Sequence, residues 1–214
     1  MSSEVLPLDR RMARGKATRL QIVTAAREVL RDEGYAAMTT RAVADRAGVQ
    51  LSLVHYHFGG KRGLLVQVLE HQNAELLPRQ RELYASPGPL SQKWRTACDY
   101  LREDVRSGYV RILWELWAAG LADAELAERW RSAVHGWREL VEGAIREWAE
   151  SLQLELPVSP RVLVTLVGSI FWGMEIEMLA GVPEDEAPHF EALDALARLI
   201  ESIEADGSDR LGLR

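Results

Sequence analysis

The sequence predicts an all-α fold of about nine helices. Apolar residues recur at intervals of three and four positions through most of the chain, as they do on one face of an α-helix. No segment shows the alternation of apolar and polar residues that indicates a half-buried strand. The 214 residues, 47% of them hydrophobic, are enough to bury a substantial core. We therefore expect a compact helical chain.

Two helices are expected near the start of the chain. Residues 17–33 carry an apolar stripe at helical spacing, and Gly34 stands where a left-handed residue would end that helix. Thr39 or Thr40 can cap a second, short helix, which Gly48 would end. The second helix is only about two turns long.

The next two helices complete a compact motif. A short helix is expected over residues 51–57, directly after the turn at residues 48–50. A longer helix starts near Lys61 and runs to about residue 80, where Pro78 marks a kink or an end. Two short helices joined by a tight glycine turn form a helix-turn-helix.

Five further helices are expected after the loop at residues 86–89. They span residues 90–106, 109–120, 123–152, 159–180 and 187–205. Ser159 and Pro160 mark the start of the fourth of these, and Gly181 marks its end. Polar and small residues interrupt the apolar run at residues 162–174, so we expect this helix to fall short of spanning a membrane.

Charge is divided unevenly along the chain. The net charge is −6, yet residues 1–62 hold 11 Lys and Arg against 6 Asp and Glu, and the remaining residues hold 15 against 26. The first third alone can therefore attract a polyanion such as nucleic acid. The predicted parts are a basic flexible arm (1–16), a helix-turn-helix domain (17–65), a helical bundle (66–205) and a flexible tail (206–214).

Several classes of protein are disfavoured. We find no nucleophile-base pair, phosphate loop or metal-ligand spacing, so the chain is not expected to be an enzyme or to need a cofactor. His55 and His57 diverge by about 200° on a helix, which makes a metal site improbable. Cys98 lies in an apolar stripe and is expected in the core. The N-terminus lacks a secretory layout, which favours the cytoplasm.

The strongest motif consists of the predicted helix-turn-helix and a short group of aromatic and basic residues that follows it. Residues 39–49 read TTRAVADRAGV, and Tyr56, His57 and Phe58 are followed by Lys61 at fixed spacing. Together these residues resemble the DNA-binding signature of the TetR family of transcriptional regulators. The resemblance covers residues 19–65. It implies a regulator whose N-terminal domain binds DNA and whose C-terminal helices bind a small molecule.

The second helix of such a motif lies in the major groove, and its exposed face meets the base edges. Val54 and Phe58 must turn inward, so the opposite face is expected to read bases. That face holds Gln50, Leu51, Ser52 and His55. His55 and Leu51 depart from the family's common pattern, in which an aromatic residue and a small or polar residue are usual; these departures concern the operator sequence.

Other residues of the motif are expected at the DNA backbone or at base edges. Arg41 can offer its planar fork to guanine, and the resemblance makes it a base reader. Lys61 starts a helix, where its ammonium and free backbone N–H groups can hold a phosphate. The remaining residues expected to contact DNA carry hydroxyl or imidazole groups: Thr39, Thr40, Tyr56 and His57.

All seven tryptophans lie between Trp94 and Trp172, in the predicted bundle. Such residues pack a plain core, or they line a ligand cavity between helices. The expected effector-binding set is Tyr109, Trp114, Trp117, Trp172 and Glu175. Aromatic faces beside a carboxylate, from Glu175 or Glu115, suit a cationic ligand. A neutral hydrophobic ligand would need no carboxylate. Glu175 and Glu177 are two positions apart and so point to different faces of their helix. Either both are charges at the protein surface or at the rim of a site, or one of them faces a cavity or a partner subunit.

The last two helices offer more apolar surface than one chain can hide. The resemblance implies that they form a four-helix bundle with their copies in a homodimer. The expected interface residues are Ile170, Met174, Met178, Phe190, Leu193, Leu196, Ile200 and Ile203. A dimer can place two recognition helices on half-sites of a palindrome.

The predicted function is therefore a cytoplasmic, DNA-binding repressor that a small hydrophobic or cationic effector releases from its operator. Its expected partners are double-stranded DNA, a second copy of the chain and the effector, with no membrane. A ligand-dependent activator is the alternative, and a partner-binding module that does not bind DNA is a further one.

Overall fold

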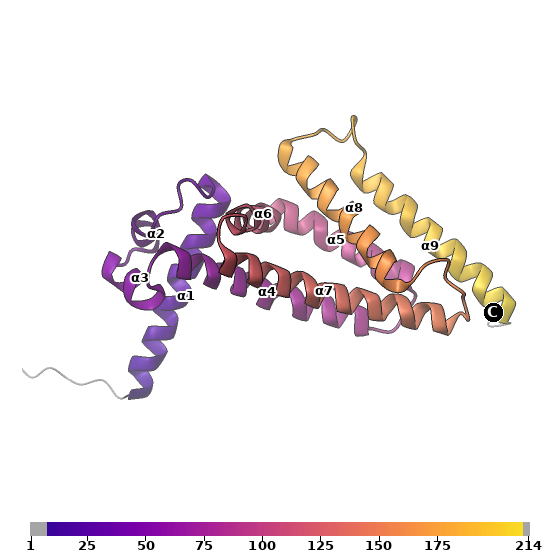
Figure 1. Cartoon of the computed structure of the whole chain (residues 1–214), viewed down its shortest axis with the longest axis horizontal. Helices are drawn as coiled ribbons and strands as arrows, with labels where there is room; N and C mark the ends of the chain where they lie inside the picture. The colour runs from indigo at the N-terminus through magenta and orange to yellow at the C-terminus, as the bar shows by residue number, and fades with distance from the viewer. Residues whose placement is uncertain (1–7, 212–214) are drawn as a thin grey trace, which may run out of the picture. The chain divides into compact units, whose positions relative to one another are not determined.

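The computed structural model describes the backbone of residues 8–211 and the side chains of residues 12–207. The described residues form α-helices joined by turns and loops, without a strand, which confirms the all-α prediction (Figure 1). The helices are α1 (Leu8–Glu33), α2 (Thr40–Ala47), α3 (Leu51–Phe58), α4 (Lys61–Ala85), α5 (Leu90–Ser107), α6 (Tyr109–Gly120), α7 (Ala124–Ser151), α8 (Pro160–Ala180) and α9 (His189–Leu211).

Helix α1 begins earlier than the sequence predicts. The expected start is residue 17, with a flexible arm before it, but the helix begins at Leu8. Residues 8–16 consist largely of Arg, Met, Ala and Lys, which have a high intrinsic preference for helix. The predicted start is too late because it relied on apolar periodicity, whereas helix preference alone can extend a helix. The remainder of the predicted arm, residues 1–7, lies outside the described residues.

Two other helices run past their predicted ends. Helix α4 continues through Pro78 to Ala85, and Pro78 lies on the exposed side of the helix. Helix α9 continues to Leu211 instead of ending at residue 205, so part of the predicted flexible tail is helical. Residues 212–214 lie outside the described residues.

The chain divides into two compact units. Unit 1 comprises Met1–Gln72 and Arg111–Trp130, and unit 2 comprises Asn73–Val110 and Arg131–Arg214. The division predicted from the sequence, at about residue 65, would place all of α6 and α7 with the C-terminal helices. Instead Ile112, Leu116 and Leu126 belong to the same buried cluster as the first four helices.

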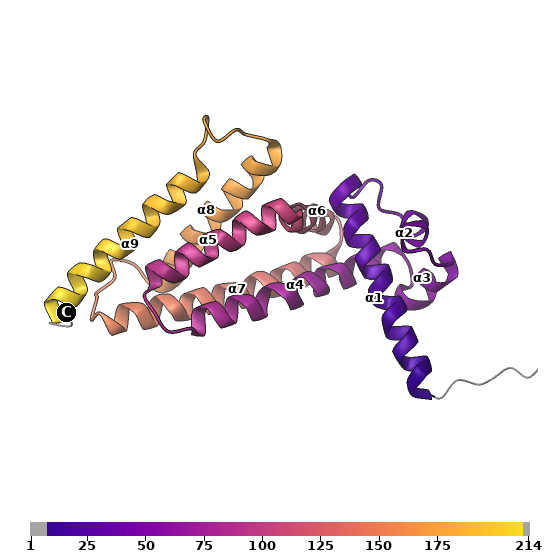
Figure 2. The same cartoon turned by 180° about the vertical axis from the view of Figure 1, so that it is seen from behind.

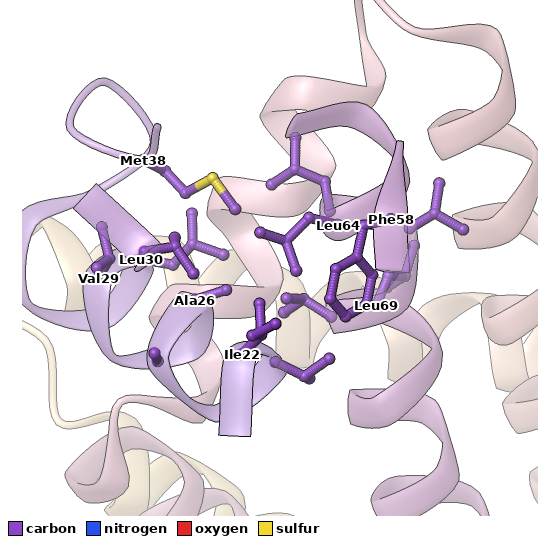
Figure 3. Close-up of a cluster of buried hydrophobic side chains, with 14 of the residues drawn as sticks. Ile22, Ala26, Val29, Leu30, Met38, Phe58, Leu64 and Leu69 are labelled. Carbon is purple, nitrogen blue, oxygen red and sulfur yellow. The ribbon is translucent and has the colours of Figure 1, made fainter. Parts of the chain in front are cut away.

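The core of unit 1 holds the helix-turn-helix together. Side chains from α1, from the loop before α2, from the end of α3 and from α4 point toward one another (Figure 3). Ile22, Leu30, Met38 and Leu64 are completely buried. Burying a side chain of this size contributes about 1.5 to 3 kcal/mol. This core fixes α2 and α3 against α1.

Unit 2 is built from longer helices. Helix α5 packs against α9 (Figure 2). The Trp94 indole N–H of α5 donates to the Leu193 carbonyl of α9 at 2.9 Å. The Trp148 indole N–H donates to Glu204 Oε1 at 3.1 Å, and the same oxygen accepts the Ser91 backbone N–H at 3.1 Å. One carboxylate of α9 therefore ties α7 to the first turn of α5.

Cys98 lies in the core of unit 2, as the sequence predicts. Burial raises the pKa of the Cys98 thiol to about 12. The thiol is therefore protonated at neutral pH and serves as a small apolar core residue.

Helix α8 is the most apolar helix of unit 2 and keeps one side uncovered. Contrary to the sequence prediction, residues 160–179 are long and apolar enough, by length and composition, to cross a membrane. The Thr165 and Ser169 hydroxyls donate to carbonyls of their own helix at 2.9 Å, so these residues interrupt the apolar run less than expected. Few side chains of α8 are buried in the chain: Val164 and Glu175 are.

Candidate nucleic-acid interface

Helix α2 is capped at both ends. The Thr39 hydroxyl accepts the Ala42 backbone N–H at 3.0 Å, so this residue, rather than Thr40, is the N-cap. Gly48 ends the helix at φ +63°, a conformation that favours glycine. Thr40 is half-buried and Arg41 is exposed. The guanidinium of Arg41 is therefore available to a ligand at the start of α2.

Helix α3 presents the predicted face to solvent. Val54 and Phe58 are buried, as the sequence predicts. The whole predicted base-facing set is exposed: Gln50, Leu51, Ser52 and His55. Tyr56 is 81% exposed, and His57 is half-buried with its ring edge-on to Tyr56 at 5.0 Å between centroids. Polar side chains therefore lie exposed on the outer face of α3, together with Leu51 and Leu53.

Lys61 stands apart from these residues at the first position of α4. Its Nζ lies 3.8 Å from the centroid of the Tyr35 ring and donates to the Tyr35 carbonyl at 3.2 Å. Partial burial lowers the pKa of the Lys61 ammonium. The side chain that the sequence predicts to hold a phosphate is thus fixed against the turn between α1 and α2.

Arg19 and Gln21 of α1 position the interface, and sequence reasoning missed both. Arg19 Nη1 donates to the His57 carbonyl at 3.3 Å, and its guanidinium lies 5.0 Å from the centroid of the Phe58 ring. Gln21 Nε2 donates to the Ala47 carbonyl at 2.7 Å. These side chains satisfy the last carbonyls of α3 and α2, which have no partner within their own helices. No local pattern marks these two residues, because they are two positions apart on α1 and so lie on different faces of the helix.

Gly63 is a second residue that the sequence reasoning passed over. A Cβ placed on Gly63 would lie 2.0 Å from the Phe58 backbone oxygen, far closer than any van der Waals contact allows. Only glycine lets the first turn of α4 approach the end of α3 so closely. A glycine within the first turn of a helix, without a cap to explain it, is a sign of close backbone approach.

The predicted effector-binding residues are divided between the two units. Trp114 and Trp117 lie in unit 1, where their rings are edge-on at 5.2 Å between centroids. Glu115 also lies in unit 1, and its Oε2 accepts the Tyr35 backbone N–H at 3.0 Å. Glu115 is thus engaged in the helix-turn-helix unit.

The other effector candidates lie in unit 2. Tyr109 and Glu175 are buried, and the Trp172 ring lies under the Arg138 guanidinium at 5.4 Å. Glu177 is exposed and bonds His189 Nε2 at 2.7 Å. Of the two glutamates, one is therefore buried and the other is a surface charge, which excludes the alternative that both are rim charges.

The predicted dimer-interface residues differ in exposure. Leu193 is completely buried within the chain, so it presents no exposed surface to a second copy. The others are half-buried: Ile170, Met174, Met178, Phe190, Leu196, Ile200 and Ile203. The most exposed apolar residues of these helices were not predicted. They are Val162, Leu166, Ile176, Leu179 and Leu199.

The fold of the first helices and the exposed face of α3 define a helix-turn-helix. Residues 22–68 match the family model for the bacterial regulatory proteins of the tetR family. This match covers the helix-turn-helix and the start of α4, so the likeness to the tetR family is a property of that segment.

Known proteins resemble the chain over different lengths. The transcriptional activator FasR of Mycolicibacterium smegmatis is 32% identical over 99 residues, which are 44% of each chain. The match therefore spans less than half of this relative. FadR of Bacillus subtilis, solved with stearoyl-CoA, superposes with a TM-score of 0.70 at 15% identity, over 85% of this chain and 96% of that one. A TetR regulator of Haloarcula marismortui gives 0.72 at 18% identity, over 86% and 96%.

Proposed function

We propose that the chain is a ligand-responsive regulator that binds a palindromic operator as a homodimer. The observation that carries this proposal is the exposed face of α3, where Gln50, Ser52 and His55 point away from a closely packed core. In this proposal α3 enters the major groove, Arg41 reads a base from α2, and Lys61 holds a phosphate. We expect the protein in the cytoplasm.

The uncovered side of α8 supports the proposed dimerisation. Val162, Leu166 and Ile176 lie on one stripe at helical spacing, and Leu166 is 55% exposed. Thr165 and Ser169 lie on the same stripe, but their hydroxyls already donate within the helix, so a second copy can cover the stripe without burying unpaired donors. An isologous contact between two copies buries this stripe on both.

The proposed effector binds in unit 2, near Tyr109, Trp172 and Glu175. The Arg138 guanidinium already lies over the Trp172 ring, so a second cation at that face would meet like charge. We therefore favour a hydrophobic effector over the cationic one. The FadR structure with stearoyl-CoA has the same fold, and its ligand has a long apolar chain.

We propose repression as the primary activity, with the effector lowering operator affinity. A ligand-dependent activator is the second candidate, and the similarity to the activator FasR favours it. A mobility-shift titration of the DNA flanking the chain's own gene, with and without effector, separates the two candidates. Release from the operator supports repression, and tighter binding supports activation; an absence of any sequence-specific binding contradicts both.

Substituting Arg41 and Lys61 should affect DNA binding in different ways. Arg41→Ala is expected to weaken operator binding by about 1 to 3 kcal/mol and to relax the preference for one base, because a bidentate arginine discriminates bases. Lys61→Ala is expected to weaken specific and random duplexes alike and to reduce the salt slope by about one. Fluorescence anisotropy against point-mutated operators at several salt concentrations measures both. If Arg41→Ala leaves the base preference unchanged, its role in base reading is wrong.

Effector class can be tested by intrinsic fluorescence and operator release together. We expect saturating release by stearoyl-CoA or a long-chain fatty acid, and none by a quaternary ammonium compound of similar length. Trp172→Phe should weaken that response, while Trp148→Phe, at the α7–α9 contact, serves as the matched control. Release by the cation alone, weakened by Glu175→Gln, would instead support the cationic effector.

A further inference from the structure

The turn between α1 and α2 carries an aromatic residue in contact with a proposed DNA-binding side chain. The Lys61 ammonium lies 3.8 Å from the centroid of the Tyr35 ring, and Nζ donates to the Tyr35 carbonyl at 3.2 Å. An ammonium has three N–H donors. One is used by the carbonyl, so the others stay available to a phosphate. Tyr35 thus restrains the Lys61 ammonium without using all of its N–H donors.

Tyr35 is itself held at both ends of its backbone. Its N–H donates to Glu115 Oε2 of α6 at 3.0 Å, and its carbonyl also accepts the Met38 N–H at 3.2 Å. The preceding residue, Gly34, has φ +81°, and a Cβ there would lie 3.0 Å from Glu115 Oε1. Glycine therefore allows the carboxylate to reach the turn. All these groups belong to unit 1.

From this geometry we propose that Tyr35 is a positioning residue for DNA binding, which sets the Lys61 ammonium for phosphate contact while Glu115 of α6 fixes the Tyr35 backbone. The inference rests on the proposed role of Lys61. A free lysine side chain loses rotamer freedom when it binds a phosphate, and the ring and carbonyl of Tyr35 remove part of that freedom beforehand. The opposite role is sequestration, in which Tyr35 competes with DNA for Lys61, and it predicts the opposite sign.

The test uses the full-length protein and a double-mutant cycle. Tyr35→Leu keeps an apolar side chain at position 35 and removes the aromatic face. We expect it to weaken binding to operator and to random duplex equally, about 5- to 10-fold, as expected for loss of a positioned phosphate contact. In the Lys61→Ala background the same substitution should have less than a twofold effect, because no ammonium remains to position. Tyr35→Phe should restore binding to within twofold of wild type.

Glu115→Gln and a matched control complete the set. Glu115→Gln keeps the hydrogen-bond acceptor without its charge, and we expect a two- to fivefold loss that also disappears in the Lys61→Ala background. Tyr100→Leu removes a comparable contact in unit 2, where the Arg79 guanidinium lies 4.4 Å from the Tyr100 ring centroid. It should leave the DNA titration unchanged. Circular dichroism verifies that each variant is folded.

The outcomes separate this inference from the proposed function. Absence of DNA binding by the wild-type protein overturns the proposed function. If the wild type binds but Tyr35→Leu strengthens binding, sequestration is correct and positioning is wrong. If Tyr35→Leu and Lys61→Ala weaken binding additively, Tyr35 acts independently of Lys61 and the inference fails, while DNA binding by the regulator stands.

Discussion

Leu166→Glu is expected to convert the proposed dimer into monomers and to reduce operator affinity at least about 100-fold, because two linked half-site contacts bind 10²- to 10⁴-fold more tightly than one. Leu166 lies near the middle of the exposed stripe of α8 and is 55% exposed in the single chain, so the substitution should leave the chain folded. In a two-fold interface the new carboxylate would be buried close to its own copy. Sedimentation velocity at micromolar concentration measures the first effect, and anisotropy with the operator measures the second.

Leu121→Glu is the matched control for this prediction. Leu121 is 73% exposed and follows the end of α6, away from α8 and α9 in the sequence, so the same chemical change should leave the dimer intact. A wild-type protein that sediments as a monomer would contradict the proposed dimer. A Leu166→Glu variant that remains dimeric and binds the operator normally would place the interface elsewhere.

Gly63→Ala is expected to destabilise unit 1 by about 3 kcal/mol, at the upper end of the effect of overpacking. The reason is that the added methyl would lie 2.0 Å from the Phe58 backbone oxygen, and a backbone atom cannot move aside as a flexible side chain can. Relief requires α3 to shift against α4, which would also displace the exposed face of α3. We therefore expect operator binding to fall together with stability.

Urea unfolding followed by circular dichroism measures this change. Gly143→Ala is the control, because a Cβ on Gly143 of α7 would contact nothing within 4 Å. It replaces a helical glycine by a better helix former and should stabilise the protein by about 0.5 to 1 kcal/mol. Equal effects of the two substitutions would show that α3 and α4 do not need the close approach at Gly63.

The parts of the fold that could be predicted from the sequence are those that depend on apolar periodicity and on glycines that end helices. Gly34 and Gly48 end α1 and α2 with positive φ, as expected, and Val54 and Phe58 turn inward. The helical extension before residue 17 was missed because its sequence shows no apolar periodicity. The assignment of α6 to unit 1 was also missed, since periodicity shows that a helix has a buried face but not which helices cover it.

The candidate interface shows the same limit at the level of single residues. Exposure of Arg41 and His55 could be expected from their positions in the motif. The contacts of Lys61 with Tyr35, and of Tyr35 with Glu115, join residues that are 26 and 80 positions apart in the chain. No local pattern reports such pairings. On α8 the predicted interface residues Ile170 and Met174 are half-buried, whereas Val162 and Leu166 are exposed, a difference that could not be foreseen because an apolar helix offers no polar face to orient it.

The uncovered stripe of α8 has a consequence for regulation if a second copy covers it, because the amount of protein then affects how much of the DNA-binding species forms. If only the dimer covers Val162, Leu166 and Ile176, the folded chain is stabilised by mass action, and its unfolding midpoint should rise with protein concentration. Below the dissociation constant of the dimer, the dimer concentration follows the square of the chain concentration, so halving synthesis leaves roughly one quarter of the DNA-binding species. Transcription of a target gene would then respond more steeply than in proportion to the supply of regulator, even with a single dimer on the operator.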